Sequence, residues 1–527
     1  MKTPPHDTPR DRDNTTTYFA AIVALGGFLF GFDASVISGV VGYIVPEFGL
    51  NEWQIGLVVG APTLAGIASS LGSGILSDML GRKRVLVALA VLYTLSAAGA
   101  AFAPNYESLV AARFVGGLAF ASLGIAPLYI AEISPEHRRG FLVSFNQFNI
   151  VIGFSAAYFA NYLLLDASKS DAAWVQALAI DRYTWRWMLG IGALPAVVWL
   201  LMLLRIPESP RWLTLKGRLH EARAVLSTMR SDESVQQTLD EIRASVSTHS
   251  ESLRTGIARL FHPSVRLALT VGLIIGIAQQ VTGVNAIYFY APSIFEQTGV
   301  GTDAAFAQAT LIGVINVIFT IVAMLLIDRL GRKPLLLLGL AGVIVSTALC
   351  SYGFGQARYQ LTASAAAALP AQIEPARLQS VIDVEYANDR EFKQALRDAI
   401  GDTALKTHEA QLIQASIQIN SYLVLAGILG FVASFAISLG PVMWVLFSEI
   451  FPNSIRGIAM AFVGFFNSLA SFAVQFLFPW ELTHLGNAST FSIFAVFGCV
   501  SLVLMAWLLP ETKGKTLEQL EADLAVR

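Results

Sequence analysis

Three amide side chains lie within seven residues of one long apolar segment. Gln279, Gln280 and Asn285 fall in the run from about residue 265 to 296, and Gly283 and Pro292 are placed to loosen that helix locally. Amides in a membrane helix are costly unless they face a cavity, and they offer donors and acceptors without a charge. The pattern favours a neutral, polyhydroxylated ligand over an ion. The alternative is that these amides only form hydrogen bonds between helices.

Other uncharged polar side chains and aromatic rings lie near the middle of neighbouring apolar runs. They are Phe30, Gln147, Asn316, Phe435, Trp444 and Asn467. Each is ordinary alone. Together they outline a chamber at the membrane midplane, whose amides and ring faces suit the O–H and C–H groups of a sugar.

A carboxylate, Asp33, lies in the middle of the first apolar run. Such a group costs about 2.5–3.5 kcal/mol on insertion scales, so it needs a partner, a wet cavity or a proton. Arg113, just inside the fourth run, is the expected partner. One interpretation is a proton site, because separating the pair would change the proton affinity of Asp33. The other is a permanent ion pair that only fixes helix packing.

The elements that hold these residues are long apolar runs. The AVILMFWYC residues make up 55% of the chain and charged residues 14%, and the mean hydropathy is +0.60. About twelve runs are long enough to cross roughly 30 Å of hydrocarbon. They extend over 18–45, 54–77, 85–103, 108–132, 143–165, 185–206, 265–296, 304–327, 333–354, 417–449, 456–480 and 488–509. The sequence therefore predicts an all-α membrane protein with twelve transmembrane helices.

Three charged motifs occur once in each half and in the same order. The frame E-I-x-P-x-x-x-R-G occupies 132–140 and 449–457, D-x-L-G-R-K occupies 78–83 and 328–333, and P-E-[S/T] occupies 207–209 and 510–512. Two similar halves with matching charged ends indicate two pseudo-symmetric six-helix bundles that work by alternating access. The predicted gate residues are Asp78 with Arg82, Glu132 with Arg139, Glu208 with Arg211, Asp328 with Arg332, and Glu449 with Arg456. Pairs between the bundles would hold the cytoplasmic side shut; otherwise the charges serve only topology and helix capping.

The distribution of basic residues predicts the topology. Arg and Lys cluster after even-numbered runs, at 82–84, 138–139, 329–333 and 456, so both termini are expected in the cytoplasm of a multi-pass protein of the cell membrane. The predicted parts are a tail 1–17, a bundle 18–206, a helical linker 207–264, a bundle 265–509 and a tail 510–527.

An insertion is predicted in the second bundle. Asp78 and Glu132 are 54 positions apart, whereas Asp328 and Glu449 are 121 apart, which locates an insertion on the outer face at about 355–415. Residues Asn388 to Gln414 show helical periodicity and could pack as a cap; the alternative is a loosely ordered, alanine-rich loop.

Composition excludes several classes of function. The net charge of −2 argues against nucleic-acid binding, and Cys350 and Cys499 both lie in apolar runs, so no disulfide framework or thiolate metal site is expected. The sequence contains no nucleophile, metal or phosphate-loop constellation, so we expect neither an enzyme nor a cofactor.

The chain resembles the sugar porter family of the major facilitator superfamily over most of its length. The resemblance rests on Gly31-Phe32-Asp33, Pro127-Leu128-Tyr129, Pro207-Glu208-Ser209-Pro210-Arg211, Gln279-Gln280 with Asn285, Gly440-Pro441 with Trp444, and Pro510-Glu511-Thr512-Lys513-Gly514. It implies the major facilitator fold and import of a monosaccharide by a monomer in the bilayer. It also implies sugar contacts from Gln147, Gln279, Gln280, Asn285, Asn316, Trp444 and Asn467, with Phe30 and Phe435 lining the site.

The resemblance also bears on energy coupling. Bacterial xylose-type proton symporters of this family carry an acid where this chain has Asp33, and facilitative glucose transporters carry Asn. The expectation is therefore sugar import coupled to a proton through Asp33 and Arg113. An uncoupled uniporter of a sugar, inositol or polyol is the alternative, and a sugar sensor on the same fold is a further one.

Overall fold

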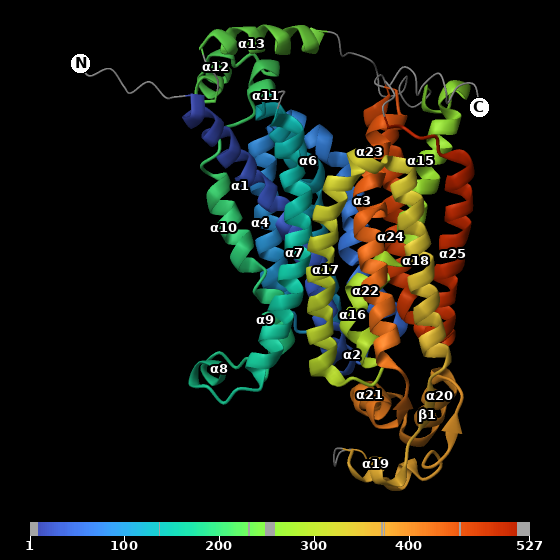
Figure 1. The fold of residues 1–527 in the computed structure, drawn as a ribbon. Helices are drawn as coiled ribbons and strands as arrows, with labels where there is room; N and C mark the ends of the chain where they lie inside the picture. Colours follow the sequence, from blue (N-terminus) through green and yellow to red (C-terminus); the bar gives the residue numbers. More distant parts are fainter. Residues whose placement is uncertain are drawn as a thin grey trace.

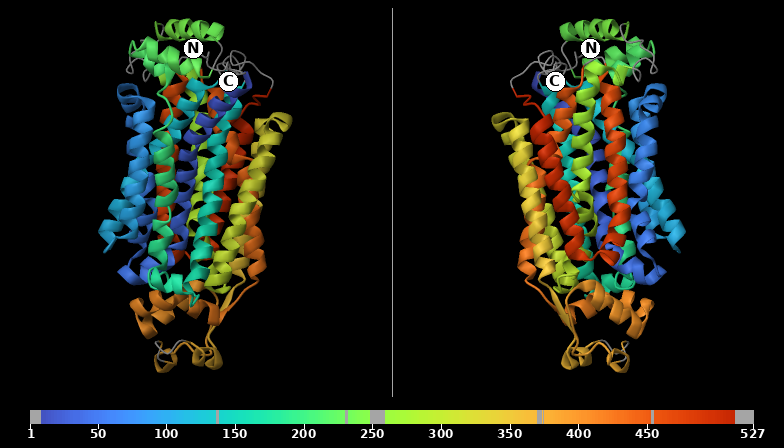
Figure 2. Two further views of the ribbon diagram at one scale, coloured as in Figure 1. Left: turned by 90° about the vertical axis from the view of Figure 1, so that its left-hand side faces the viewer. Right: turned by 90° about the vertical axis from the view of Figure 1, so that its right-hand side faces the viewer.

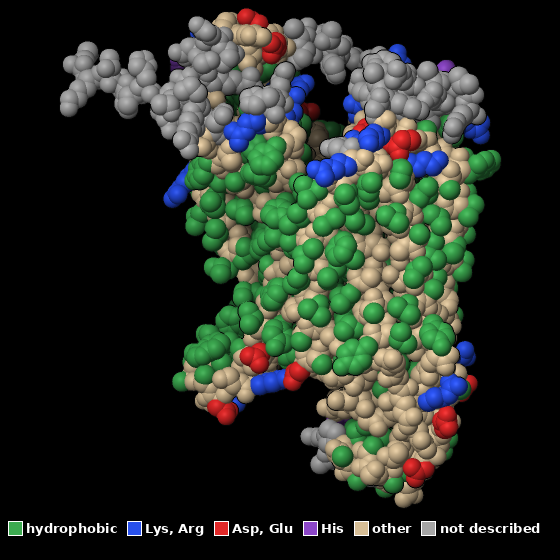
Figure 3. Space-filling model, in the orientation of Figure 1, with side chains coloured by type: hydrophobic (Ala, Val, Ile, Leu, Met, Phe, Trp, Pro, Cys, Tyr) green, Lys and Arg blue, Asp and Glu red, His purple; other side chains and the backbone are tan. Residues whose placement is uncertain are grey.

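The structure is a computed structural model that describes residues 9–135, 138–229, 232–247, 259–369, 373, 375–452 and 455–513. Within these residues, 12 helical segments are long and apolar enough to cross a membrane, as the apolar runs predict. They form two groups of near-parallel helices that lie side by side (Figure 1). In the space-filling view, hydrophobic side chains cover the middle of the visible face, and charged ones gather at its two ends (Figure 3).

The N-terminal half supplies six spans. These are α1 (Pro9–Val36) with η1 (Ile37–Gly39) and α2 (Val41–Phe48), α3 (Glu52–Leu80), α4 (Arg82–Ala101), α5 (Tyr106–Leu118) with η2 (Ala119–Ala121) and α6 (Ser122–Ile133), α7 (Arg139–Ser168), and α9 (Thr184–Gly190) with α10 (Ala193–Leu203). A short helix, α8 (Ala173–Ala177), precedes α9. Asn51 and Asn105 begin α3 and α5 with capping boxes, because their side chains accept from the backbone three residues on.

The C-terminal half repeats this arrangement. Its spans are α15 (Pro263–Val281) with α16 (Val284–Glu296), α17 (Gly301–Leu330), α18 (Arg332–Gly355), α22 (Ser421–Ile437) with α23 (Leu439–Ile450), α24 (Arg456–His484) and α25 (Asn487–Leu508). Helices α11 (Pro210–Leu215), α12 (Leu219–Ser227) and α13 (Asp232–Ser247) follow the first half and lie together at one end of the molecule (Figure 2). We call this the linker end.

Besides the sixth span, which divides into α9 and α10, two spans of each half are interrupted at corresponding places. The first span changes to a 3-10 turn at Ile37–Gly39 and the fourth at Ala119–Ala121. The seventh is broken at Gly283 and the tenth at Ser438, which has φ −129° and ψ −90°. Interrupted spans leave backbone groups free to bind partners near the membrane midplane.

Residues between α18 and α22 fold into a separate unit at the opposite end from the linker helices (Figure 1). It contains β1 (Arg358–Gln360), α19 (Ala363–Ala367), η4 (Pro375–Leu378), β2 (Glu385–Tyr386), α20 (Asp389–Ile400), α21 (Asp402–Ser416) and β3 (Ile417–Gln418). We call this unit the insertion and its side of the molecule the insertion end.

The insertion has its own hydrophobic core. The helical periodicity of Asn388 to Gln414 is confirmed by α20 and α21, whose Phe392, Leu396 and Leu412 are fully buried. The insertion also contains a sheet that was not predicted, in which the strand order is β2-β1-β3 and both pairings are antiparallel. Strands of two or three residues carry too little alternation to be recognised from sequence.

The two halves pack closely toward the insertion end. A Cβ atom at Gly56 of α3 would lie 2.2 Å from the Phe476 carbonyl oxygen of α24, and one at Gly313 of α17 would lie 2.8 Å from the Ser155 Cα of α7. Glycine at these positions lets the helices of opposite halves approach. At the linker end, by contrast, the surface between the halves is hollowed (Figure 3).

Candidate functional site

Gly283 interrupts the seventh span and positions the amides. Its φ of +94° favours glycine, and a Cβ atom there would lie 2.5 Å from the Phe494 ring. Tyr290, two residues before Pro292, also leaves helical geometry with φ −123° and ψ 17°. The predicted loosening of this helix by Gly283 and Pro292 is confirmed.

Four of the predicted amides form one hydrogen-bonded group, which we call the amide cluster: Gln279, Gln280, Asn285 and Asn467. Gln280 Nε2 donates to Gln279 Oε1 at 2.9 Å and to Asn467 Oδ1 at 3.3 Å. Asn285 Nδ2 donates to Gln280 Oε1 at 2.7 Å, and Asn467 Nδ2 donates to Gln279 Oε1 at 3.0 Å. Residues far apart in the sequence thus meet at the break between α15 and α16. A hydroxyl-bearing ligand can replace amide–amide bonds with bonds of its own at little net cost.

Two backbone carbonyls orient the cluster. Gln279 Nε2 donates to the Leu439 oxygen at 3.1 Å, next to the break in the tenth span. Asn467 Nδ2 donates to the Gly276 oxygen at 2.7 Å. These bonds fix the orientation of the Gln279 and Asn467 amides, because each nitrogen must face its carbonyl. They also attach the cluster to α15, α23 and α24.

The two predicted phenylalanines, Phe30 and Phe435, are connected across the halves by rings that the prediction left out. Phe30 lies 6.5 Å from Phe154, Phe154 lies 5.3 Å from Tyr288, and Tyr288 lies 6.5 Å from Phe435, measured between ring centroids. Phe154 comes seven residues after Gln147 on the same helix, so it shares that face. That spacing could have identified it.

Gln147, Asn316 and Trp444 lie apart from the hydrogen bonds of the cluster. Gln147 is half-buried on α7, Asn316 is buried on α17, and Trp444 is 47% exposed on α23. Among the described residues, no hydrogen bond joins any of the three to the amide cluster. Their side chains are therefore available to a ligand without loss of an internal hydrogen bond.

Ser471 and Gln475 extend the cluster along α24. Asn285 Nδ2 donates to Ser471 Oγ at 2.6 Å, and Gln475 Nε2 donates to the same oxygen at 2.8 Å. They follow Asn467 at four and eight residues, which is the repeat of one helix face. Neither residue was predicted, although this spacing is visible in the sequence.

Asp33 and Arg113 meet as expected. Arg113 Nη1 donates to Asp33 Oδ1 and to the Asp33 backbone oxygen, each at 3.1 Å. The Arg113 side chain is 2% exposed and that of Asp33 17%. Asp33 Oδ2 is buried and has no hydrogen-bond partner among the described residues. Arg113 therefore binds only one of the two carboxylate oxygens, and the other oxygen can take a proton.

At the linker end of the N-terminal half, Arg82 forms ion pairs with two carboxylates. Its guanidinium lies 2.7 Å from Asp78 and 3.1 Å from Glu132. Glu208 accepts from the Lys83 backbone nitrogen at 3.0 Å and sits over Gly81, where a Cβ atom would lie 2.3 Å from its oxygen. The D-x-L-G-R-K and E-I-x-P motifs therefore form one charged group with Glu208.

The C-terminal half repeats the group with the equivalent residues. Arg332 lies 3.0 Å from Glu449, and Glu511 accepts from the backbone nitrogens of Arg332 and Lys333. A Cβ atom at Gly331 would lie 2.9 Å from Glu511. The side chain of Asp328 lies outside the described residues.

Several of the predicted ion pairs are not the ones observed. Glu132 binds Arg82 rather than Arg139, and Glu449 binds Arg332 rather than Arg456. In each half the glutamate lies beside the first turn of the helix that begins with the bound arginine, α4 or α18. Arg456 Nε donates instead to the Phe451 oxygen. Glu208 accepts from backbone nitrogens, and Arg211 is exposed. In this conformation the observed ion pairs of these motifs lie inside each half, not between the halves.

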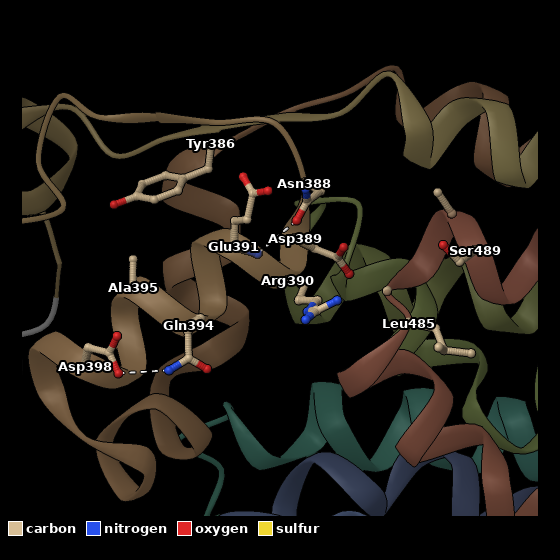
Figure 4. Close-up of a pocket in the computed structure, with 12 residues that line it drawn as sticks. Tyr386, Asn388, Asp389, Arg390, Glu391, Gln394, Ala395, Asp398, Leu485 and Ser489 are labelled. Carbon is tan, nitrogen blue, oxygen red and sulfur yellow. Dashed lines mark hydrogen bonds between the residues drawn. The ribbon is translucent and has the colours of Figure 1, made fainter.

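A separate polar cavity of about 920 Å³ lies at the insertion end, between α20 and the start of α25 (Figure 4). Tyr386, Asp389 and Glu391 line it, together with Ser489. The Asp389 carboxylate is already occupied, because it accepts from the backbone and side-chain nitrogens of Asn487 at 3.1 and 2.8 Å. These bonds anchor the insertion to α25, and none of the predicted site residues lines this cavity.

Comparison with known proteins identifies the family to which this chain belongs. The sequence model of the family described as "Sugar (and other) transporter" matches residues 19–369 and 403–524. The chain belongs to this family. The unmatched stretch between the two matches falls inside the insertion, and the fold is that of the major facilitator superfamily.

Relatives with assigned substrates align over nearly the whole chain. The chain is 32% identical to the arabinose-proton symporter of Bacillus subtilis, covering 94% of this chain and 92% of that protein. It is 32% identical to the D-xylose-proton symporter of Escherichia coli, covering 95% and 94%. It is also 32% identical to the major myo-inositol transporter IolT of Bacillus subtilis, covering 95% and 93%.

Solved structures agree with the sequence comparison. The inward-open conformation of the xylose transporter XylE from E. coli superposes with a TM-score of 0.72 at 28% identity, covering 96% of this chain and 98% of that one. The XylE structure bound to 6-bromo-6-deoxy-D-glucose gives 0.66 at 30% identity, covering 97% and 100%.

Proposed function

We propose that this protein imports a monosaccharide together with a proton by alternating access. The observation that carries the proposal is the amide cluster, which gathers uncharged donors and acceptors from α15, α16 and α24 at an interrupted span. Neutral amides beside aromatic rings match the hydroxyl groups and C–H faces of a sugar. Relatives named for arabinose, xylose and myo-inositol transport support this class of substrate.

Asp33 carries the proton in this proposal. In the part of the chain that the structure describes, its Oδ2 atom has no partner, while Oδ1 accepts from Arg113. A buried carboxylate with one free oxygen is stable either as an ion beside Arg113 or as a neutral acid, so a movement of α1 against α5 would change its proton occupancy. The symport activity named for two of the relatives supports this assignment.

The linker end faces the cytoplasm in this proposal. Arg82, Lys83, Arg332 and Lys333 lie there, in accord with the excess of basic residues on cytoplasmic loops. The halves are packed at the insertion end and hollowed between them at the linker end, which corresponds to an inward-facing state (Figure 3). Transport then requires the halves to separate at the insertion end and close at the linker end. We further propose that one chain is the working unit, since each chain holds both candidate sites.

Flux in proteoliposomes tests the proposal. Purified protein would be reconstituted and supplied with labelled D-xylose, L-arabinose, D-glucose or myo-inositol, with and without an inward proton gradient. We expect gradient-driven accumulation of at least one monosaccharide, and thermal stabilisation of the protein by that same sugar, because a ligand that binds only the native state raises its stability. Downhill flux that ignores the proton gradient would instead indicate an uncoupled uniporter, and absence of flux and of stabilisation by every sugar would contradict the proposal.

A further inference from the structure

The hydrogen bonds of the amide cluster do not end within the C-terminal half. Thr63 Oγ1 of α3 donates to Gln475 Oε1 of α24 at 3.0 Å. Gln475 is 1% exposed, and its Nε2 donates at 2.8 Å to Ser471, which also receives the hydrogen bond of Asn285. An unbroken chain of side chains therefore runs from the candidate sugar amides to the N-terminal half.

The last bond in this chain crosses between the two halves where they are packed. The Gly56 backbone of α3 meets the Phe476 backbone of α24, and a Cβ atom at Gly60 would lie 3.0 Å from the Phe472 ring. Gln475 lies eight residues beyond Asn467 toward the insertion end, which is about 12 Å along a helix. Opening the insertion end must separate α3 from α24 and so break the Thr63–Gln475 bond.

The direction of each bond depends on the one before it. Ser471 Oγ accepts from both Asn285 and Gln475, so Gln475 must present its Nε2 to Ser471 and its Oε1 to Thr63. If a ligand takes the Asn285 donor, Ser471 loses one of its two donors and Gln475 is held less firmly. The orientation of Gln475, and with it the bond to Thr63, then depends on what the amides bind.

We propose that Thr63 and Gln475 form a latch at the insertion end, and that its strength is set by the amide cluster through Ser471. They are positioning residues, since the chain places Asn285 and Ser471 between them and the ligand. The latch rests on the proposed function only in naming the ligand as a sugar. Its mechanical part, closure of α3 on α24, is independent of the substrate.

The test measures opening of the insertion end without any sugar. Phe476→Cys, in a Cys499→Ser background, places a thiol beside the packed α3–α24 interface, where the half-buried Phe476 ring lies against Trp53 of α3. A membrane-impermeant maleimide added to proteoliposomes should label it faster when that interface opens. Thr63→Val removes the donor without changing the shape of the side chain. Loss of one hydrogen bond should raise the labelling rate about 3- to 10-fold.

Matched variants separate the latch from a general loss of packing. Thr63→Ser keeps the hydroxyl and should restore the parental rate. Thr94→Val removes a half-buried hydroxyl that donates only within its own helix, to the Ala90 oxygen, and should leave the rate unchanged. Equal rates for Thr63→Val, Thr63→Ser and Thr94→Val would overturn the latch.

A double-mutant cycle tests the link to the amides. Asn285→Ala should raise the labelling rate when Thr63 is present and have little further effect in Thr63→Val, because both changes act on one chain of bonds. Independent, multiplicative effects would refute the coupling through Ser471 while leaving the latch itself in place. Because no sugar is used, either outcome can be told from failure of the proposed transport activity, which the flux assay reports.

Discussion

The two halves place different chemistry at the same structural position. In the N-terminal half, the interrupted first span carries Asp33, which is bound to Arg113 on one side only. In the C-terminal half, the interrupted seventh span carries Gln279, Gln280 and Asn285, whose amides bind one another. One fold, used twice, thus offers an ionisable site in one half and a neutral polar site in the other. The comparison suggests a division of labour, with the proton handled by the first half and the sugar by the second.

Asp33→Asn tests the ionisable half and should have the largest effect. The amide keeps the shape of the side chain but cannot lose a proton, so gradient-driven accumulation of sugar should fall to the level reached without a gradient. Downhill sugar exchange should persist. Accumulation would be measured in proteoliposomes with an inward proton gradient, with Asp166→Asn, an exposed carboxylate on α7, as the control. Full accumulation by Asp33→Asn would assign the pair to helix packing alone.

The variants Arg82→Gln and Arg332→Gln compare how much the two charged groups at the linker end contribute to stability. Glu132 is 3% exposed and Arg82 5%, whereas Glu449 is 22% exposed and Arg332 16%. Removing one partner of a buried pair costs about 3–5 kcal/mol, because the other charge stays buried, and the cost falls with exposure to water. Arg82→Gln should therefore lower the midpoint of thermal unfolding more than Arg332→Gln. A larger decrease for Arg332→Gln would show that burial does not determine how much these groups contribute to stability.

Gln280→Ala and Asn285→Ala test the neutral half. Each should weaken sugar binding by about 1–3 kcal/mol, which is roughly 5- to 150-fold, because ligand hydroxyls lose their partners. Binding would be measured by the dependence of thermal stabilisation on sugar concentration. Gln237→Ala, at an exposed position of α13, is the matched control. Parental affinity in both variants would remove the seventh span from the site.

Acid pH should destabilise mainly the insertion, and this is the smallest of the effects we expect. Burial is the largest single effect on Glu409 and raises its pKa, but the Lys393 charge, the hydrogen bonds from Lys393 and Gln297, and the Arg397 charge together outweigh it and lower the pKa of the carboxyl. Glu409 also accepts from Gln297 at the end of the seventh span. A lowered pKa means that the stabilisation is complete above the unfolded pKa of about 4.3 and is lost as the pH falls through the folded value.

The measurement for this prediction is hydrogen exchange. Protection of α20 and α21 should decrease below about pH 4 while the membrane spans keep theirs. Glu409→Gln should show the lower protection of these helices already at neutral pH. Protection that is equal at about pH 3 and at pH 7 in the parental protein, after correction for intrinsic exchange, would show that the Glu409 pair does not hold the insertion.

Much of the fold was predictable because its signals are local. Each span is a long, mainly apolar run, and the repeated motifs revealed two halves before any contact was known. Asp33 with Arg113 could be paired because a buried carboxylate has few alternatives in a membrane. The pairing of Glu132 with Arg82 was missed, because Arg82 lies 50 positions away in the sequence and only the packing of α6 on the α3–α4 turn brings it to the acid.

The site was predictable in its composition and less so in its connections. Gln279, Gln280, Asn285 and Asn467 were recognised as unusual residues, but sequence does not show that they bind one another. Ser471, Gln475 and Thr63 were overlooked because hydroxyls are common in membrane helices and one amide is inconspicuous. Their importance comes from position, and contacts between residues more than four hundred positions apart cannot be read from local pattern.

The most direct test of the division of labour is to record sugar-evoked proton uptake and sugar counterflow in the same vesicles. A pH-sensitive dye inside the vesicles reports the proton, and labelled sugar reports exchange. The account predicts that Asp33→Asn abolishes proton uptake and keeps counterflow, whereas Gln280→Ala diminishes both in parallel. Proton uptake that persists in Asp33→Asn, or counterflow at parental affinity in Gln280→Ala, would contradict it.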